Sequence, residues 1–251
     1  KEACLLNYNS SSASVTAPIP RHEPLGHPGV PPLLRLLGES AVLGEWARGR
    51  RAARQLAAGR DGGGRPVLVL PGFLAADRST GLLQSVLNQA GYSTAGWGLG
   101  RNRGISATLL NAMLDKVETL SRRHDRPVAL IGWSLGGLYA REIARMLPDH
   151  VDRVVTLGSP FSGDLRHNRA WRLYEYVSGH SVDAPPVPCR LHEKPPVRTI
   201  ALWSARDGIV APASARGLVS EADVRREVDC THLGFVCAPK ALTAILDVLE
   251  A

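Results

Sequence analysis

The stretch Ala129–Ala140, ALIGWSLGGLYA, decides how this chain folds. A short apolar run ends at Gly132, and a helix-like apolar pattern begins just after Ser134, without loop residues between them. Glycines stand two residues before and two residues after Ser134, where a β-carbon would collide if a strand and a helix passed closely. We therefore predict a sharp strand-to-helix turn that lifts the Ser134 hydroxyl clear of a sheet and places the next backbone N–H at a helix N-terminus.

Apolar runs of strand length alternate with helical apolar spacing on both sides of this turn. The expected strands are VLVL (67–70), YSTAGW (92–97), PVALIG (127–132), RVVTLGS (153–159) and VRTIALWS (197–204). Helical spacing falls at 82–90, 109–120, 138–147 and 239–251. Strands that are separated by helices predict an α/β fold, with a mostly parallel central sheet and helices on both faces.

The alternating pattern begins only after a glycine-rich break, GRDGGGRP (59–66). Before it we expect an N-terminal unit, 1–64, that consists of an irregular arm followed by an amphipathic helical segment from Pro31. That helical segment is expected to pack on the body, with a membrane surface as the alternative. The second unit, 65–251, carries an insertion at about 161–197, which is long for a connection inside a domain and predicts a lid or binding loop.

Two polar residues downstream are candidates to act with Ser134. Asp207, in WSARDGIVAP, follows an expected strand directly, and His232, in VDCTHLGFV, lies after the next strand candidate and before the last helix. Asp164 and Asp229 are weaker alternatives for the acid, because one lies in the insertion and the other in or near a strand. The insertion also holds His167, His180 and His192, which we expect to line or cover a pocket.

This combination resembles the α/β-hydrolase superfamily, in particular serine hydrolases of the bacterial esterase and lipase type. The resemblance covers about Val67 to the C-terminus, and the chain order Ser, Asp, His is that of the family. It implies Ser134 as nucleophile, His232 as general base and Asp207 as the residue that orients the imidazole. It also implies an oxyanion hole made by the backbone N–H groups of Leu135 and of Phe73 in VLPGF, which departs from the HGGG loop of some relatives.

The expected substrate is a carboxylic ester with an apolar acyl chain. Thioester or lactone hydrolysis and acyl transfer would use the same three residues, and a non-catalytic protein of this fold is the remaining alternative. The loop WGLGRNRG (97–104) lacks the spacing of a dinucleotide site and is interpreted as a pocket edge. The residues expected at the substrate pocket are Trp97, Arg101, Trp133, Phe161 and Leu233.

Composition limits the other partners. The net charge of +7 is spread along the chain apart from RGRRAAR (48–54), which lacks interleaved aromatic residues, so we do not expect a nucleic-acid partner. The cysteines Cys4, Cys189, Cys230 and Cys237 have no metal-ligand spacing and predict buried thiols or at most two disulfides. We expect neither a metal nor a cofactor. A cytoplasmic location is favoured, with export as the alternative, and oligomeric state is left open.

Overall fold

The computed structural model describes residues 30–251 except 165, 167, 170, 180, 182–185, 188–189 and 192. Its centre is a six-stranded sheet in the order β2-β1-β3-β4-β5-β6, and all five neighbouring pairs run parallel. The strands are β1 (Pro66–Leu70), β2 (Ser93–Gly96), β3 (Val128–Trp133), β4 (Val151–Leu157), β5 (Arg198–Trp203) and β6 (Val224–Glu227). The predicted α/β fold with a parallel sheet is confirmed.

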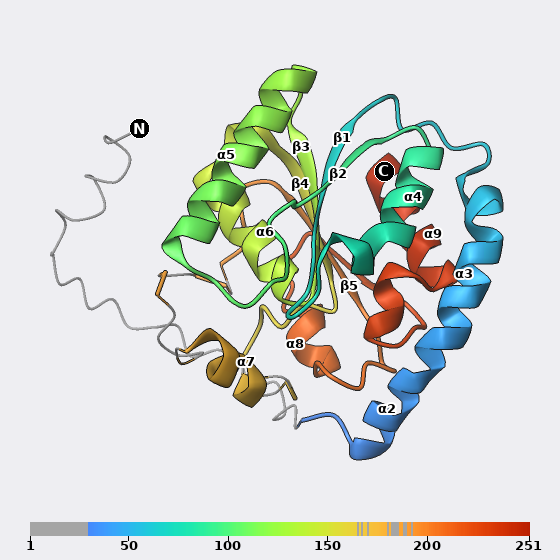
Figure 1. Cartoon of the computed structure of the whole chain (residues 1–251), viewed down its shortest axis with the longest axis vertical. Helices are drawn as coiled ribbons and strands as arrows, with labels where there is room; N and C mark the ends of the chain where they lie inside the picture. The colour runs from blue at the N-terminus through green and yellow to red at the C-terminus, as the bar shows by residue number, and fades with distance from the viewer. Residues whose placement is uncertain are drawn as a thin grey trace, which may run out of the picture.

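Helices cover both faces of the sheet (Figure 1). On one side lie α5 (Ala107–His124) and α6 (Leu135–Met146); on the other lie α4 (Gly81–Gln89) and α9 (Pro239–Glu250). Successive strand residues point to opposite faces, so Leu68 and Leu130 join the core beneath α5 and α6, whereas Val69 and Ile131 join the core beneath α4 and α9. Burial on both faces explains why these strands are continuous apolar runs.

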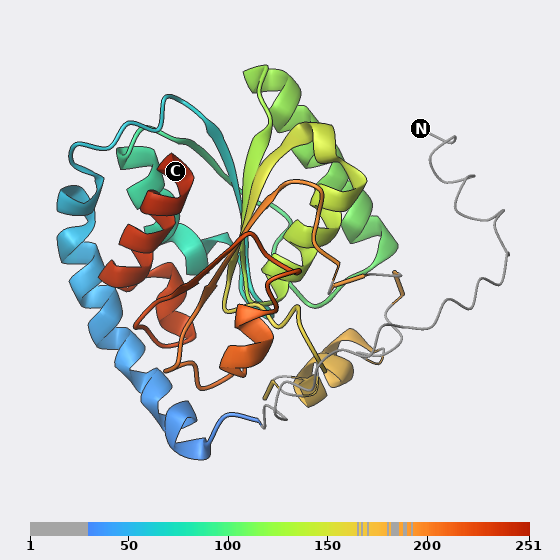
Figure 2. The ribbon, with the colours of Figure 1, turned by 180° about the vertical axis from the view of Figure 1, so that it is seen from behind.

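The N-terminal helical segment forms an outer layer on one of these faces. It consists of α2 (Leu33–Gly38), the 3₁₀ turn η1 (Glu39–Ala41) and α3 (Val42–Ala57). Helix α3 packs across α4 and α9, as the view from behind also shows (Figure 2). Its small residues Gly49, Ala53 and Ala57 are buried, and a β-carbon at Gly49 would overlap the carbonyl of Cys237. Small side chains thus allow close contact between α3 and the body. The expected arm before residue 30 lies outside the described residues.

The expected insertion lies between β4 and β5 and carries the short helix α7 (Trp171–Ser178). Helices α7 and α2 lie at the same end of the molecule (Figures 1 and 2). The remaining short elements are η2 (Asp77–Thr80), η3 (Pro148–His150), α8 (Pro212–Arg216) and η5 (Leu233–Val236). Among the residues described above, no helix is long and apolar enough to cross a membrane.

Candidate active site

The turn between β3 and α6 places Ser134 in a strained conformation. Its backbone has φ 54° and ψ −120°, a region that side-chain-bearing residues rarely occupy. A β-carbon at Gly132 would lie 2.3 Å from the Cα of Gly137, and one at Gly136 would lie 2.3 Å from the carbonyl oxygen of Leu70. The two glycines that flank Ser134 in the sequence are therefore required by backbone contacts on both sides of the turn.

Asp207 and His232 are joined by a short hydrogen bond. His232 Nδ1 lies 2.7 Å from Asp207 Oδ2, and both side chains are almost fully buried. The other carboxylate oxygen, Asp207 Oδ1, accepts from the backbone N–H groups of Ile209 at 2.9 Å and Val210 at 2.7 Å. These three hydrogen bonds fix the carboxylate within the turn after β5. Among the described residues, no hydrogen bond engages the other ring nitrogen of His232, Nε2.

Charge and burial act in opposite directions on the imidazole. Burial lowers the pKa of His232, but the charge and hydrogen bond of Asp207, together with the charge of Glu39, outweigh it. The pKa of His232 therefore lies above its ordinary value, because the positive form is stabilised by nearby carboxylates. Such an environment suits a base that must carry a transient positive charge.

Ser134 lies at the same edge of the sheet as this pair. It follows β3, whereas Asp207 follows β5 and His232 follows β6, and the carboxyl ends of parallel strands share one edge. The indole Nε1 of the adjacent Trp133 donates to the carbonyl oxygen of His232 at 3.1 Å, which ties the two loops together. Within the described residues, no hydrogen bond joins the Ser134 hydroxyl to His232.

The loop after β1 passes directly beside Ser134. A β-carbon on Gly72 would lie 3.2 Å from Cβ of Ser134, so glycine allows this approach. The next backbone N–H, of Phe73, donates to no residue that the structure describes. Leu135 is the first residue of α6, where backbone N–H groups have no partner inside the helix. Both predicted oxyanion donors therefore belong to segments that border Ser134.

The fully buried residue Asn102 holds the loop after β1 in place. Its Nδ2 donates to the carbonyl of Pro71 at 2.9 Å, and its Oδ1 accepts from the hydroxyl of Tyr139 at 3.1 Å. Its backbone carbonyl accepts from the N–H of Leu74 at 2.7 Å, and its backbone N–H donates to the carbonyl of Ala75 at 2.8 Å. Asn102 thus bridges the loop after β1 and helix α6.

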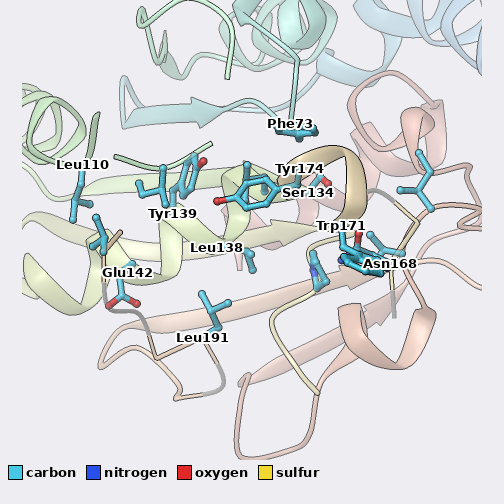
Figure 3. Close-up of a pocket in the computed structure, with 16 residues that line it drawn as sticks. Phe73, Leu110, Ser134, Leu138, Tyr139, Glu142, Asn168, Trp171, Tyr174 and Leu191 are labelled. Atoms are coloured by element: carbon cyan, nitrogen blue, oxygen red, sulfur yellow. The ribbon is translucent and has the colours of Figure 1, made fainter. Parts of the chain in front are cut away.

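A largely apolar pocket opens at Ser134 (Figure 3). Helix α6 supplies one wall, and the insertion supplies the aromatic side chains of Trp171 and Tyr174. The Tyr174 ring lies 5.4 Å from the ring of Phe73, which belongs to the loop after β1. Among the lining residues, Glu142 carries a formal charge at neutral pH. The pocket is lined by Phe73, Ile105, Leu110, Ser134, Leu135, Leu138, Tyr139, Glu142, Pro160, Asn168, Trp171, Tyr174, Val187, Leu191, Ile209 and Val210.

The five residues expected at the substrate pocket are not part of this lining. Trp97 is buried in the core, where its indole donates to the carbonyl of Gly100, and Arg101 is exposed to solvent. Trp133 packs in the core and bonds to the His232 carbonyl instead. The two tryptophans thus pack in the core and anchor loops, and Arg101 faces solvent.

Phe161 and Leu233 are likewise occupied elsewhere. The Phe161 ring packs beneath the guanidinium of Arg141, whose Cζ lies 4.2 Å from the ring centroid. Leu233 packs against the core as a half-buried side chain. The pocket wall that was not predicted from the sequence consists of the side chains of Leu135, Leu138 and Tyr139. Their helical spacing just after Ser134 was a usable signal for that wall.

The remaining predictions about cysteines and histidines are answered only in part. Cys230 and Cys237 are free, buried thiols, and burial raises both of their pKa values, that of Cys237 to about 12. Cys4, Cys189, His167, His180 and His192 lie outside the described residues. The part of the chain that the structure describes contains no group of three His, Cys, Asp or Glu side chains that could hold a metal ion.

Comparison with known proteins places this site in a wider group. A family model described as the alpha/beta hydrolase fold matches residues 66–184. A curated relative, the pimeloyl-acyl-carrier-protein methyl ester esterase of Pectobacterium carotovorum, is 42% identical over 62 residues. That match covers 25% of this chain and 23% of the relative, so it spans less than a quarter of the relative's length.

Solved structures agree with the family model. Lipase B of Aspergillus fumigatus superposes with a TM-score of 0.58 at 18% identity, covering 77% of this chain and 55% of the lipase. The lipase BlEst2 of Bacillus licheniformis superposes with a TM-score of 0.54 at 16% identity, covering 76% of this chain and 94% of that chain. At such identities the likeness concerns the fold. The matching family model, the parallel sheet and the serine turn after β3 together show that the chain has the α/β-hydrolase fold.

Proposed function

We propose that the chain is a serine hydrolase that cleaves carboxylic esters through Ser134, His232 and Asp207. The observation that carries the proposal is the 2.7 Å contact between His232 Nδ1 and Asp207 Oδ2 at the sheet edge where the strained Ser134 turn lies. This contact fixes the imidazole with Nε2 available to remove a proton from a hydroxyl. The lack of a hydrogen bond between Ser134 and His232 among the described residues is compatible with catalysis, because such hydrogen bonds often form or tighten only with substrate bound.

The proposed reaction has two halves. Ser134 Oγ attacks the ester carbonyl while His232 Nε2 takes its proton, and Asp207 stabilises the resulting imidazolium. The carbonyl oxygen becomes an oxyanion that accepts hydrogen bonds from the N–H groups of Phe73 and Leu135. Collapse releases the alcohol, which receives the proton from His232 and leaves an acyl group on Ser134. Water, deprotonated by His232, then hydrolyses this acyl-enzyme and regenerates the serine.

The pocket supports an apolar acyl group. Apolar and aromatic side chains make up most of the lining beside Ser134, and each methylene buried there contributes about 0.8 kcal/mol. The curated relative is named an esterase of a methyl ester, which agrees with ester chemistry on this fold. Hydrolysis of thioesters and lactones and acyl transfer would use the same acyl-enzyme, and the substrate panel below separates ester from thioester and lactone hydrolysis.

Hydrolysis of nitrophenyl esters tests the proposal. We expect kcat/KM to rise from acetate to octanoate in the intact chain, and Ser134→Ala to lower kcat by roughly 1000-fold or more. Ser85→Ala, an exposed serine on α4, is the control and is expected to hydrolyse at the original rate. Matched thioester and lactone substrates are assayed in parallel. Equal activity of Ser134→Ala and the original chain would refute the role of Ser134.

A further inference from the structure

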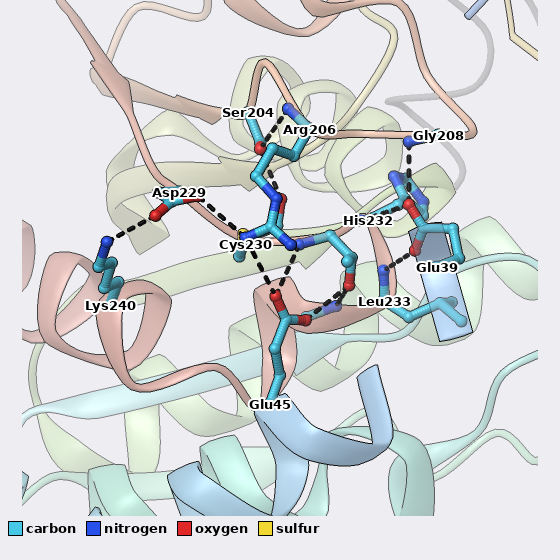
Figure 4. A network of polar contacts seen from close by, with 12 residues as sticks. Glu39, Glu45, Ser204, Arg206, Gly208, Asp229, Cys230, His232, Leu233 and Lys240 are labelled. Atoms are coloured by element: carbon cyan, nitrogen blue, oxygen red, sulfur yellow. Dashed lines mark hydrogen bonds and ion pairs between the residues drawn. The ribbon is translucent and has the colours of Figure 1, made fainter. Parts of the chain in front are cut away.

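Two buried glutamates from the N-terminal helical segment lie against the loops that carry Asp207 and His232 (Figure 4). Glu39, in η1, is 6% exposed, and its Oε1 accepts from the backbone N–H groups of Gly208 and His232, both at 2.9 Å. Its Oε2 accepts from the N–H of Leu233 at 3.0 Å. One carboxylate therefore bonds to the residue after Asp207, to His232 itself and to the residue that follows it.

Glu45, six residues further along the same segment, also accepts hydrogen bonds from the histidine loop. Its side chain is 3% exposed and accepts from Thr231, from the backbone N–H at 3.1 Å and from the hydroxyl at 2.6 Å. The Thr231 hydroxyl in turn accepts from the N–H of Gly234 at 3.0 Å. Glu39 and Glu45 thus accept four hydrogen bonds from the loop 231–234, and Glu39 accepts a fifth from Gly208.

A buried carboxylate is costly unless hydrogen bonds or a cation compensate for its lost hydration. The contacts of Glu39 are all neutral backbone N–H groups, and among the described residues no ion pair with it is formed. Its negative charge is thus left beside the imidazole. The titratable groups that face His232 are Asp207 from the loop after β5 and Glu39 from η1, while Trp133 and Phe235 contribute aromatic rings. Arg206 lies 4.0 Å from Glu45 and is half exposed.

We propose that Glu39 is a positioning residue of the active site, which clamps the loop of Asp207 to the loop of His232 and stabilises the imidazolium by its charge. This inference rests on the proposed function above. It makes the segment α2–η1–α3 a part of the catalytic unit, although it precedes the region that matches the family model. Glu39 does not line the pocket, so its effect is expected on the chemical step and not on substrate binding.

The electrostatic environment supports the second half of this proposal. The pKa of His232 is lowered by burial and raised by Asp207 and, in smaller part, by Glu39. Glu39→Gln keeps the size and one acceptor oxygen but removes the charge. The pKa of His232 should therefore fall, and the acid limb of kcat/KM, which follows protonation of the base, should move to lower pH.

The kinetic test compares Glu39→Gln with a matched buried control. Glu221 is 4% exposed and accepts from the N–H of Leu218 at 2.6 Å, in the connection before β6, so Glu221→Gln controls for removal of a buried carboxylate. We expect Glu39→Gln to lower kcat roughly 10- to 100-fold, because the charge-assisted hydrogen bonds of the carboxylate are lost. KM is expected to stay unchanged. Glu221→Gln is expected to keep kcat and the acid limb of the original chain.

A second readout does not depend on activity. NMR titration of the His232 imidazole in a Ser134→Ala background should give a lower pKa with Glu39→Gln and an unchanged pKa with Glu221→Gln. Glu39→Asp keeps the charge, and we expect the pKa of His232 to stay close to its raised value in this variant. The aspartate variant keeps the inference testable if Glu39→Gln does not fold. If Ser134→Ala is fully active, the proposed function fails, whereas the titration still tests Glu39. An unchanged pKa in Glu39→Gln, or an equal fall in the glutamine and aspartate variants, would overturn the inference.

Discussion

At the residue scale, the strained backbone of Ser134 depends on what the neighbouring glycines allow. Non-glycine residues with positive φ are uncommon, and at Ser134 this conformation occurs between a buried strand and a buried helix. The backbone N–H of Ser134 donates to the carbonyl of Leu157 at 2.8 Å, which fixes the turn to the neighbouring strand β4. The strain is thus held by the packing of β3, β4 and α6 around one residue.

Gly132→Ala should destabilise the protein, because its β-carbon would lie 2.3 Å from the backbone of Gly137. Overpacking of this kind costs about 1–3 kcal/mol, and we expect a lower urea midpoint. Gly81→Ala is the matched control: Gly81 has helical φ and ψ and no atom within 4 Å of its β-carbon position. There alanine should stabilise by about 0.4–1 kcal/mol. Equal midpoints for the two variants would contradict the steric argument.

At the element scale, the loop after β1 keeps its shape through contacts with α6 and with the loop after β2. Asn102 supplies these contacts through its side chain and its backbone, while Leu74 has a positive φ of 59°. The position of the Phe73 N–H beside Ser134 is therefore set by a buried amide and not by the loop alone.

Asn102→Ala should lower both stability and turnover. The carbonyl of Pro71 and the hydroxyl of Tyr139 would each lose a partner, and an unsatisfied buried polar group costs about 1–3 kcal/mol. The loop would also no longer hold the Phe73 N–H in place, so kcat for nitrophenyl esters should fall. Asn88→Ala is the control: Asn88 is exposed and its side chain accepts from the backbone N–H of Thr94, so this variant should keep the original kcat. Thermal unfolding and ester hydrolysis measure the two effects. Original kcat in Asn102→Ala would contradict the bracing role.

The elements themselves were largely predictable from local patterns. Apolar runs such as 67–70 and 197–204 identify β1 and β5, because a strand buried on both faces needs continuous apolar residues. Helical spacing identifies α5 and α9, because a helix that is buried along one side repeats its apolar residues with the helical period. The pocket wall was harder to predict, because the aromatic residues near the turn have other contacts. Trp97 and Trp133 pack in the core, and Phe161 packs against Arg141.

At the scale of the whole molecule, contacts between distant segments complete the site. Glu39 meets His232 across 193 positions of sequence, and no local pattern pairs these residues. Arg141 is another such case: it is fully buried and donates to the carbonyls of Leu191 and Glu193 in the insertion, at 3.0 and 3.1 Å. Its pKa is lowered by burial to about 10, which leaves it charged at neutral pH. Tertiary structure alone brings these groups together.

The most direct test of the central claim is covalent labelling by a fluorophosphonate, read by intact mass and peptide mapping. A serine activated by His232 and Asp207 should form one adduct per chain at Ser134, and labelling should disappear in Ser134→Ala, in His232→Ala and in urea-unfolded protein. Ser85→Ala should label like the original chain. An unlabelled folded protein, or an adduct on another serine that survives Ser134→Ala, would contradict the account.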